Sequence, residues 1–384
     1  MKIIINIYSI PKFIYFWISI IVACTLLIKI LVVHILIPIS AAEVSSIRFI
    51  GSATLPTGLN FKGTELGGLS GITYDANKDL YYAISDDRSG KYPARFYTLK
   101  IDLSQNNLVE KGVKPVEVTT LLDIKGQDFS KHTIDAEGIA LTKNKNIYIS
   151  SEGNIEQSIQ PFIKKFSLAS GNEINSLPIP NKFLSSSNGK QGIRNNLAFE
   201  SLTITPNQKY LFTASENALI LDGAEAKPGS STPCRILQYN LITQRPEKEF
   251  LYETEPVESI LNIPYLFASG LSDLLAISDS GDFLSIERSL TGLGFSVRIY
   301  RFSLEGATDI SNVDSLLKVS SQLIKPVKKE LLLDLRKLNM PLDNIEGLTF
   351  GPNLSKGDRT LILISDNNFQ PIQKTQILAF RLKM

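Results

Sequence analysis

Acidic residues recur at the two ends of paired apolar runs along this chain. In the segment DAEGIALTKNKNIYISSEG (135–153), Glu137 stands before the first run and Glu152 follows the second. Four further segments repeat the arrangement, with Ser70 and either Asp86 or Asp87, Glu200 and Glu216, Asp273 and Glu287, and Glu346 and Asp366. Nine of these ten positions are acidic, so we expect carboxylates from separate parts of the chain to meet.

Carboxylates that converge repel one another unless a cation compensates them or some take up protons. Oxygen donors without thiol or imidazole partners select calcium or magnesium, and only His132 and Cys234 follow residue 42. The pattern predicts one or more calcium ions bound by acids of this set: Glu137, Glu152, Glu200, Glu216, Asp273, Glu287 and Glu346. The alternative is that duplication copied acids that cap strand ends and turns.

Two arginines adjoin these acids, in DRS (Arg88) and ERS (Arg288). Beside a cation, an arginine suits an anionic substrate through paired hydrogen bonds, although Arg288 could equally form an ordinary ion pair. Glu137 or Glu346 is the expected general base. A serine triad is not expected, because the chain has no G-x-S-x-G motif and His132 is the one histidine after residue 42.

The elements that position these residues form five repeats, which begin near residues 69, 135, 198, 270 and 344. Each repeat contains two strand-like runs, a third after a variable loop and, in most, a fourth. Such repeats predict an all-β protein, a β-propeller of five or six four-stranded blades. We expect 46–55 to close the last blade as its fourth strand. A sixth blade could lie in 177–196 or 255–268, and a β-sandwich is the alternative fold.

The first 42 residues differ in composition from the rest. They contain no acid, and an apolar run over 13–39 precedes Ser40, Ala41 and Ala42. This is typical of a cleaved export signal, but the run is also long enough for an uncleaved membrane anchor. We therefore expect a propeller domain over 43–384 in an exported protein, periplasmic or extracellular. The near-neutral charge after residue 42 does not indicate nucleic-acid binding.

Together, LSGITYD, DAEGIAL, ESLTITPNQKYLFTASEN, GLSDLLAI and NIEGLTFGP resemble the bacterial phytase-like domain family, described as having esterase-like activity of phytase. The resemblance covers about Phe49 to Met384 and implies a β-propeller that hydrolyses esters or phosphate esters. Calcium-dependent β-propeller phytases are more distantly similar. They imply metal-binding roles for Glu137, Glu200, Asp273 and Glu346, supported by Glu152, Glu216 and Glu287. The near-neutral charge argues against phytate itself as substrate.

Three functions remain open from the sequence. The first is a calcium-dependent hydrolase of small anionic phosphate or carboxyl esters. The second is a non-catalytic binding or scaffold propeller stabilised by calcium, since a fold does not decide a function. The third is a lactonase-like propeller, in which one calcium ion polarises a ring ester.

Overall fold

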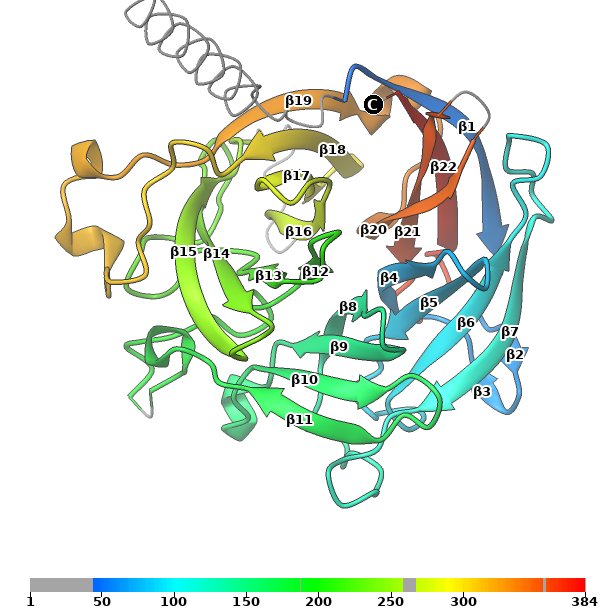
Figure 1. The fold of residues 1–384 in the computed structure, drawn as a ribbon, viewed down its shortest axis with the longest axis horizontal. Helices are drawn as coiled ribbons and strands as arrows, with labels where there is room; N and C mark the ends of the chain where they lie inside the picture. Colours follow the sequence, from blue (N-terminus) through cyan, green and yellow to red (C-terminus); the bar gives the residue numbers. More distant parts are fainter. Residues whose placement is uncertain (1–43, 187, 258–266, 355–356, 384) are drawn as a thin grey trace, which may run out of the picture. The chain divides into compact units, whose positions relative to one another are not determined.

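In the computed structural model, the described residues are 44–383 except 187, 258–266 and 355–356. They form five four-stranded antiparallel sheets arranged around a central axis (Figure 1), which confirms the predicted propeller with five blades. The predicted leader (1–42), including its apolar run, lies outside the described residues. Within the described part of the chain, no helix has the length and apolar character needed to cross a membrane.

The first four blades each use four consecutive strands. Blade one contains β4 (Leu69–Asp75), β5 (Leu80–Ser85), β6 (Arg95–Ile101) and β7 (Val113–Thr120). Blade two contains β8 (Ala136–Leu141), β9 (Asn146–Ser151), β10 (Phe162–Ser167) and β11 (Glu173–Leu177). Blade three contains β12 (Thr203–Ile204), β13 (Tyr210–Ala214), β14 (Pro233–Asn240) and β15 (Arg245–Glu253). Blade four contains β16 (Ala268–Ala276), β17 (Asp282–Thr291), β18 (Gly294–Ser303) and β19 (Lys328–Asp334).

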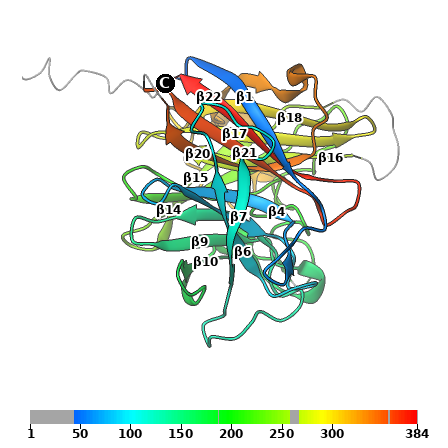
Figure 2. The same cartoon turned by 90° about the vertical axis from the view of Figure 1, so that its right-hand side faces the viewer.

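Blade five is closed by the N-terminal strand of the described chain. It contains β20 (Asn344–Asn353), β21 (Arg359–Asp366) and β22 (Thr375–Lys383), and β1 (Ser46–Leu55) pairs antiparallel with β22. Figure 1 shows β1 in blue beside β22 in red, and Figure 2 shows the sheets from the side. The predicted closing strand is confirmed. Because β1 covers the outer edge of blade five, that edge does not offer unpaired backbone groups to another chain.

Outside the blades, the regular structure consists of short elements. A hairpin of β2 (Asn60–Phe61) and β3 (Thr64–Glu65) precedes blade one. The 3-10 helices are η1 (Ile155–Gln157), η2 (Asn181–Phe183), η3 (Leu316–Lys318), η4 (Ser321–Leu323) and η5 (Leu335–Leu338). The described part of 177–196, where a sixth blade could lie, contains the end of β11 and η2.

Local sequence explains the repeated hairpins between the first two strands of a blade. In blades one to four the turn contains a residue with positive φ, namely Asp79, Lys145, Gln208 and Gly281. A turn of this kind reverses the chain within a few residues. The strands that follow are rich in Tyr, Ile, Leu and Phe and are buried, because each blade packs between two others.

The hydrophobic core lies between neighbouring blades. Tyr82 and Ile84 of blade one pack with Ile147 of blade two, and Phe212 of blade three packs with Phe283 of blade four. One further cluster joins Ile362 and Ile377 of blade five to Tyr81 of blade one. Both faces of a blade therefore bury apolar side chains, and the inner strands β4, β8, β12, β16 and β20 are fixed around the axis.

A glycine allows β1 to reach both blade five and the loop after β6. Gly51 has φ +132° at a bulge in β1, and a Cβ atom there would lie 2.0 Å from the Leu108 carbonyl oxygen. We expect Gly51→Ala to destabilise the protein by at least about 2 kcal/mol. Gly58→Ala is the matched control, because Gly58 also has positive φ (+80°) but no atom would lie within 4 Å of its Cβ. The control should cost about 1 kcal/mol. Equal losses in urea unfolding would contradict the role of the close contact.

Candidate active site at the acidic mouth

Each blade contains one extra residue where its inner strand begins. In blade one, Leu69 pairs with Ser85 and Gly71 pairs with Ile84, so that Ser70 is left as a bulge. The pairing also shifts by one residue at Ser272 and Glu346 in blades four and five, between Ala136 and Ile139 in blade two, and between Phe199 and Thr203 in blade three. The equivalent positions are Ser70, Glu137, Glu200, Ser272 and Glu346. A bulge turns its side chain out of the regular alternation, so the backbone explains how these residues come to face the axis.

The second set of residues follows the paired end of each second strand. Ser85, Ser151, Ser215, Glu287 and Ser365 pair with the inner strands. The residues one position later are Asp86, Glu152, Glu216, Arg288 and Asp366. Successive side chains of a strand point to opposite faces. This second set therefore points away from the side chains of Ser85 and its equivalents, and toward the bulged residues of the inner strands. Asp86 rather than Asp87 belongs to it. Asp87 instead binds Arg95 outside the mouth, with 2.6 Å between Asp87 Oδ2 and Arg95 Nη1.

The sequence alignment of the fourth repeat was wrong by one residue. Asp273 occupies the position of Gly71 and Gly138, and Glu287 occupies that of Ser85. The Asp273 carboxylate accepts backbone N–H bonds from Leu274 and Leu348, at 2.8 Å each. Whether either acid binds metal stays a prediction, but the structure separates both from the other predicted ligands.

Glu287 lies in a different polar cluster. Its Oε1 lies 2.9 Å from the Tyr252 hydroxyl and 2.6 Å from Lys329 Nζ, and its Oε2 accepts the Glu255 N–H. Lys329 therefore compensates the charge of Glu287 outside the central site.

Eight acids remain together at this end of the axis, and we call them the acid ring. Its members are Asp86, Asp135, Glu137, Glu152, Glu200, Glu216, Glu346 and Asp366. Burial raises the pKa of every one of these carboxyl groups, and repulsion from other ring members raises most of them further. The pKa of Glu216 rises from 4.5 to about 7, even though Arg288 opposes the shift. Without a cation, the folded protein therefore favours the protonated form of these carboxyl groups more than the unfolded chain does.

Three of these acids are close enough to share one ion. Asp135, Glu137 and Glu152 each offer an oxygen, and the three oxygens lie within 4.8 Å of one another. Arg88 borders the group, with Nε donating to Asp135 Oδ1 at 2.7 Å and Nη2 donating to Asn196. The Arg88 side chain is 39% exposed, whereas that of Asp135 is 5% exposed. Arg88 is therefore an accessible cation above a buried carboxylate group.

Arg288 forms ion pairs with two other ring acids. Its Nη2 lies 3.2 Å from Glu216 Oε1 and 3.0 Å from Glu346 Oε1. Asn344 donates to the same Glu346 oxygen at 2.8 Å. Arg288 is 9% exposed, so it is less available to a substrate than Arg88. The ion pair that the sequence left open is present.

Three buried oxygen atoms at this end of the axis have no hydrogen-bond partner among the described residues. They are Asp86 Oδ1, Ser272 Oγ and Asn344 Oδ1. A buried acceptor without a donor is unfavourable. Oxygen acceptors beside carboxylates are the donor set that calcium and magnesium bind. The residues present therefore fit a hard divalent cation.

Sequence reasoning missed Asp135 and Asn344, although a signal for both exists. They stand two residues before Glu137 and Glu346 in DAEG and NIEG. The shared D/N-x-E-G pattern places an oxygen donor beside the bulged glutamate in blades two and five. Among the other predicted residues, Glu137, Glu152, Glu200, Glu216 and Glu346 are brought together, with Arg88 and Arg288 beside them.

Neither His132 nor Cys234 donates a side-chain hydrogen bond to a ring carboxylate of the described residues. His132 is exposed and donates its backbone N–H to the Arg88 carbonyl at 2.7 Å. Cys234 is buried and free, with Sγ 3.1 Å from the Glu216 carbonyl oxygen. Burial raises the pKa of the Cys234 thiol well above its usual range, so it stays a neutral thiol.

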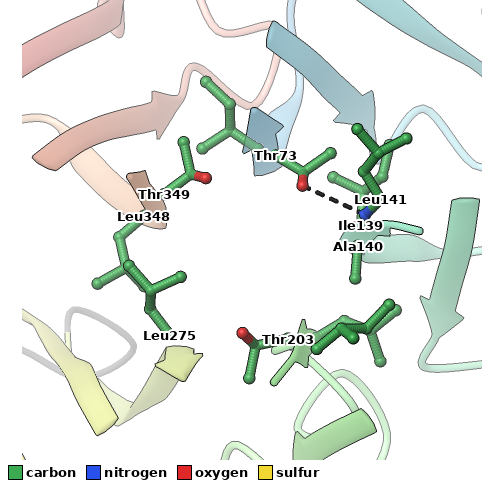
Figure 3. Close-up of a pocket in the computed structure, with 11 residues that line it drawn as sticks. Thr73, Ile139, Ala140, Leu141, Thr203, Leu275, Leu348 and Thr349 are labelled. Atoms are coloured by element: carbon green, nitrogen blue, oxygen red, sulfur yellow. Dashed lines mark hydrogen bonds between the residues drawn. The ribbon is translucent and has the colours of Figure 1, made fainter. Parts of the chain in front are cut away.

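The opposite end of the axis has a different lining. A small pocket is lined mainly by apolar residues and by Thr73, Thr203 and Thr349 (Figure 3). Thr73 accepts the Leu141 N–H, and Thr203 accepts the Ala276 N–H. These bonds join the inner strands of neighbouring blades. No member of the acid ring lines this pocket, so the charged chemistry is confined to one end.

Comparison with known proteins identifies one family. The family model described as phytase-like, with esterase-like activity of phytase, matches residues 64–369. No curated protein matches the chain. The matched segment spans all five inner strands and every member of the acid ring.

Among solved structures, the chain is similar to a Kuenenia stuttgartiensis hydrazine synthase, at 12% identity and a TM-score of 0.34, over 82% of this chain and 80% of that one. It is also similar to an endo-arabinase from Bacteroides thetaiotaomicron VPI-5482, at 11% identity and a TM-score of 0.42, over 86% and 97%. The Dos1 propeller matches at 9% identity and a TM-score of 0.35, over 87% and 95%. Likeness at this level says nothing about what the chain acts on.

Proposed function

We propose, from the fact that this chain belongs to the phytase-like family, that it is a calcium-dependent hydrolase of small anionic esters. The observation that carries the proposal is the buried group of Asp135, Glu137 and Glu152 beneath the exposed side of Arg88. Carboxylates select a hard cation, and an arginine at the entrance selects an anion. Phosphate esters fit this combination best, and carboxyl esters that carry a negative charge are the alternative.

The roles of the chain's residues follow from their contacts. Asp135, Glu137 and Glu152 would hold the ion. When bound, calcium supplies a Lewis acid that draws electron density from the ester. Arg88 would orient the anionic group of the substrate. We assign the general base to Glu346, because its Oε1 is held by Asn344 and Arg288 while its other oxygen accepts no hydrogen bond from the described residues.

The proposed proton movements use the same ring. Water adds to the phosphorus or carbonyl carbon while Glu346 accepts its proton. The bond to the leaving alcohol breaks, and a protonated neighbour returns a proton to the departing oxygen. Asp366 suits that second role, since burial and the nearby Glu346 hold its pKa well above its usual range.

The proposal is tested by turnover of two small esters, p-nitrophenyl phosphate and p-nitrophenyl acetate. We expect the phosphate ester to be hydrolysed in calcium, activity to disappear with chelator, and calcium to restore it. Arg88→Met should raise KM for the phosphate ester by about tenfold or more and leave the neutral acetate unchanged. Lys91→Met is the matched control, since Lys91 lies in the same loop but pairs with Glu65. A folded protein that binds no calcium and turns over neither ester would contradict the proposal.

We also propose that the protein is exported. The supporting feature is the acid-free leader with its apolar run over 13–39. Extracellular calcium would then be available to the ring. N-terminal sequencing of the mature protein, together with cell fractionation, distinguishes cleavage after Ala42 from retention as a membrane anchor.

A further inference from the structure

The acid ring contains one position where the chain supplies its own cation. The residue directly after the paired end of the second strand is an acid in blades one, two, three and five, namely Asp86, Glu152, Glu216 and Asp366. In blade four it is Arg288. Blade four also has Ser272 where three other blades have Glu137, Glu200 and Glu346. Blade four therefore offers no carboxylate at either ring position and a guanidinium at one of them.

Arg288 contacts the blades on both of its sides. Its Nη2 lies 3.2 Å from Glu216 Oε1 of blade three and 3.0 Å from Glu346 Oε1 of blade five. One cationic nitrogen thus bridges two carboxylates that would otherwise repel each other. A divalent ion commonly makes the same bridging contact between acidic side chains.

Two other buried oxygens, one on blade four and one on blade five, lack a partner. Ser272 is 1% exposed and Asn344 is 5% exposed, and neither Ser272 Oγ nor Asn344 Oδ1 has a hydrogen-bond partner among the described residues. Asn344 is attached to the contact directly, because its Nδ2 donates to Glu346 Oε1. Arg288 is a hydrogen-bond donor only, yet its Nε is also without a described partner. The Arg288 guanidinium therefore compensates charge on Glu216 and Glu346, but it leaves Ser272 Oγ and Asn344 Oδ1 without a hydrogen bond.

We propose that Arg288 stands in for a divalent cation on the blade-four side of the ring, between Glu216 and Glu346. The ring then has two unlike halves. One half, at Asp135, Glu137 and Glu152, is open to an exchangeable ion. The other half carries a tethered charge that cannot dissociate or be removed by a chelator. Arg288 is in this sense a positioning residue, which holds Glu346 without competing for the ion.

This inference rests on the proposed function only for the ion at Asp135, Glu137 and Glu152, so the test counts ions rather than turnover. The measurement is calcium bound per chain at neutral pH, by equilibrium dialysis of the 43–384 protein after chelator treatment. We expect Arg288→Met to bind one more calcium ion per chain than the unchanged protein. Methionine keeps a long flexible stem but removes the charge, so Glu216, Glu346, Asn344 and Ser272 become available as ligands.

Two variants serve as controls. Lys329→Met removes a cation of similar burial, 12% against 10% side-chain exposure, that pairs with Glu255 and Glu287 outside the ring. It should leave the calcium count unchanged. The double variant Arg288→Met with Glu346→Gln removes a ligand of the new site and should return the count to that of the unchanged protein.

Each outcome decides between the two ideas. An extra calcium ion in Arg288→Met supports the inference. It does so even when the unchanged protein binds no calcium, although that absence would overturn the proposed function. Equal counts in both proteins overturn the inference, and a bound ion in each leaves the proposed function standing. If Arg288→Met unfolds without calcium and refolds with it, the inference is also supported. A variant that stays unfolded in calcium overturns it, because a divalent ion then fails to replace the guanidinium.

Discussion

Replacement of Glu137 by glutamine is expected to lower ester turnover at least about 100-fold while making the calcium-free protein more stable. Glu137 belongs to the group that would hold the ion. Burial and repulsion from Glu200, Asp135, Asp86 and Glu152 raise its pKa well above the usual range. The neutral amide removes one charge from this repulsion, so the ring is relieved at the same time as it loses a ligand. Melting temperatures with chelator and with calcium, measured beside turnover, check both effects.

Glu287→Gln is the matched control for this experiment. It is the same substitution at an acid that the repeat pattern grouped with Glu137, but Glu287 binds Lys329 and Tyr252 outside the ring. It should leave calcium binding and turnover near normal and should destabilise the protein, because Lys329 loses a charged partner. If Glu137→Gln behaves like Glu287→Gln, the assignment of the ion to Asp135, Glu137 and Glu152 is wrong.

The second large effect is an inverted dependence of stability on pH in the absence of calcium. A carboxyl group whose folded pKa is raised binds its proton more tightly in the folded state than in the unfolded state. Its contribution to stability is therefore complete below the unfolded pKa and is lost as pH rises through the folded pKa. For Glu216, which shifts from 4.5 to about 7, this loss is about 3 kcal/mol between pH 4.5 and pH 7. Other ring members with raised pKa values act in the same direction.

Urea unfolding at pH 5 and pH 7.5, each with chelator and with calcium, measures this effect. We expect the chelated protein to be more stable at pH 5, and calcium to restore most of the difference at pH 7.5, since an ion stabilises the ionised carboxylates that bind it. A chelated protein that is more stable at pH 7.5 would show that the ring's charges are compensated by some other means.

The fold could be predicted from the sequence because each blade repeats the same signals. Short runs of Tyr, Ile and Leu end at turns that accept positive φ, as at Lys145 and Gln208. The strand at 46–55 precedes the first repeat, and the last repeat lacks a fourth strand, so the two could be matched. These are local features that recur in the printed sequence, so five copies reinforce one another.

The candidate site could be predicted only in part, because ring membership depends on register. In blade four, GLSDLL offers both Ser272 and Asp273 to the bulge, and the pairing of Leu271 with Glu287 decides for Ser272. A shift of one residue turns a side chain to the other face, and no composition or spacing rule reveals it. The Arg288 contact with Glu346 joins two blades across 58 positions of sequence, which likewise lies beyond local pattern.

Asp273 has a consequence for how firmly the ring is held. Its carboxylate accepts backbone bonds from its own blade and from Leu348 of blade five, below the ring. At this level Gly347 would place a Cβ 3.1 Å from the Gly71 Cα, and the pocket at the far end contains no ring acid. The Asp273 bonds and the close approach of Gly347 to Gly71 fix the spacing of the inner strands, and with it the spacing of the ring acids that those strands carry. Free phosphate presents the same charge and oxygen atoms as the phosphate group of the ester, so in the proposed function it should compete with the ester for Arg88 and the ion and act as a competitive inhibitor.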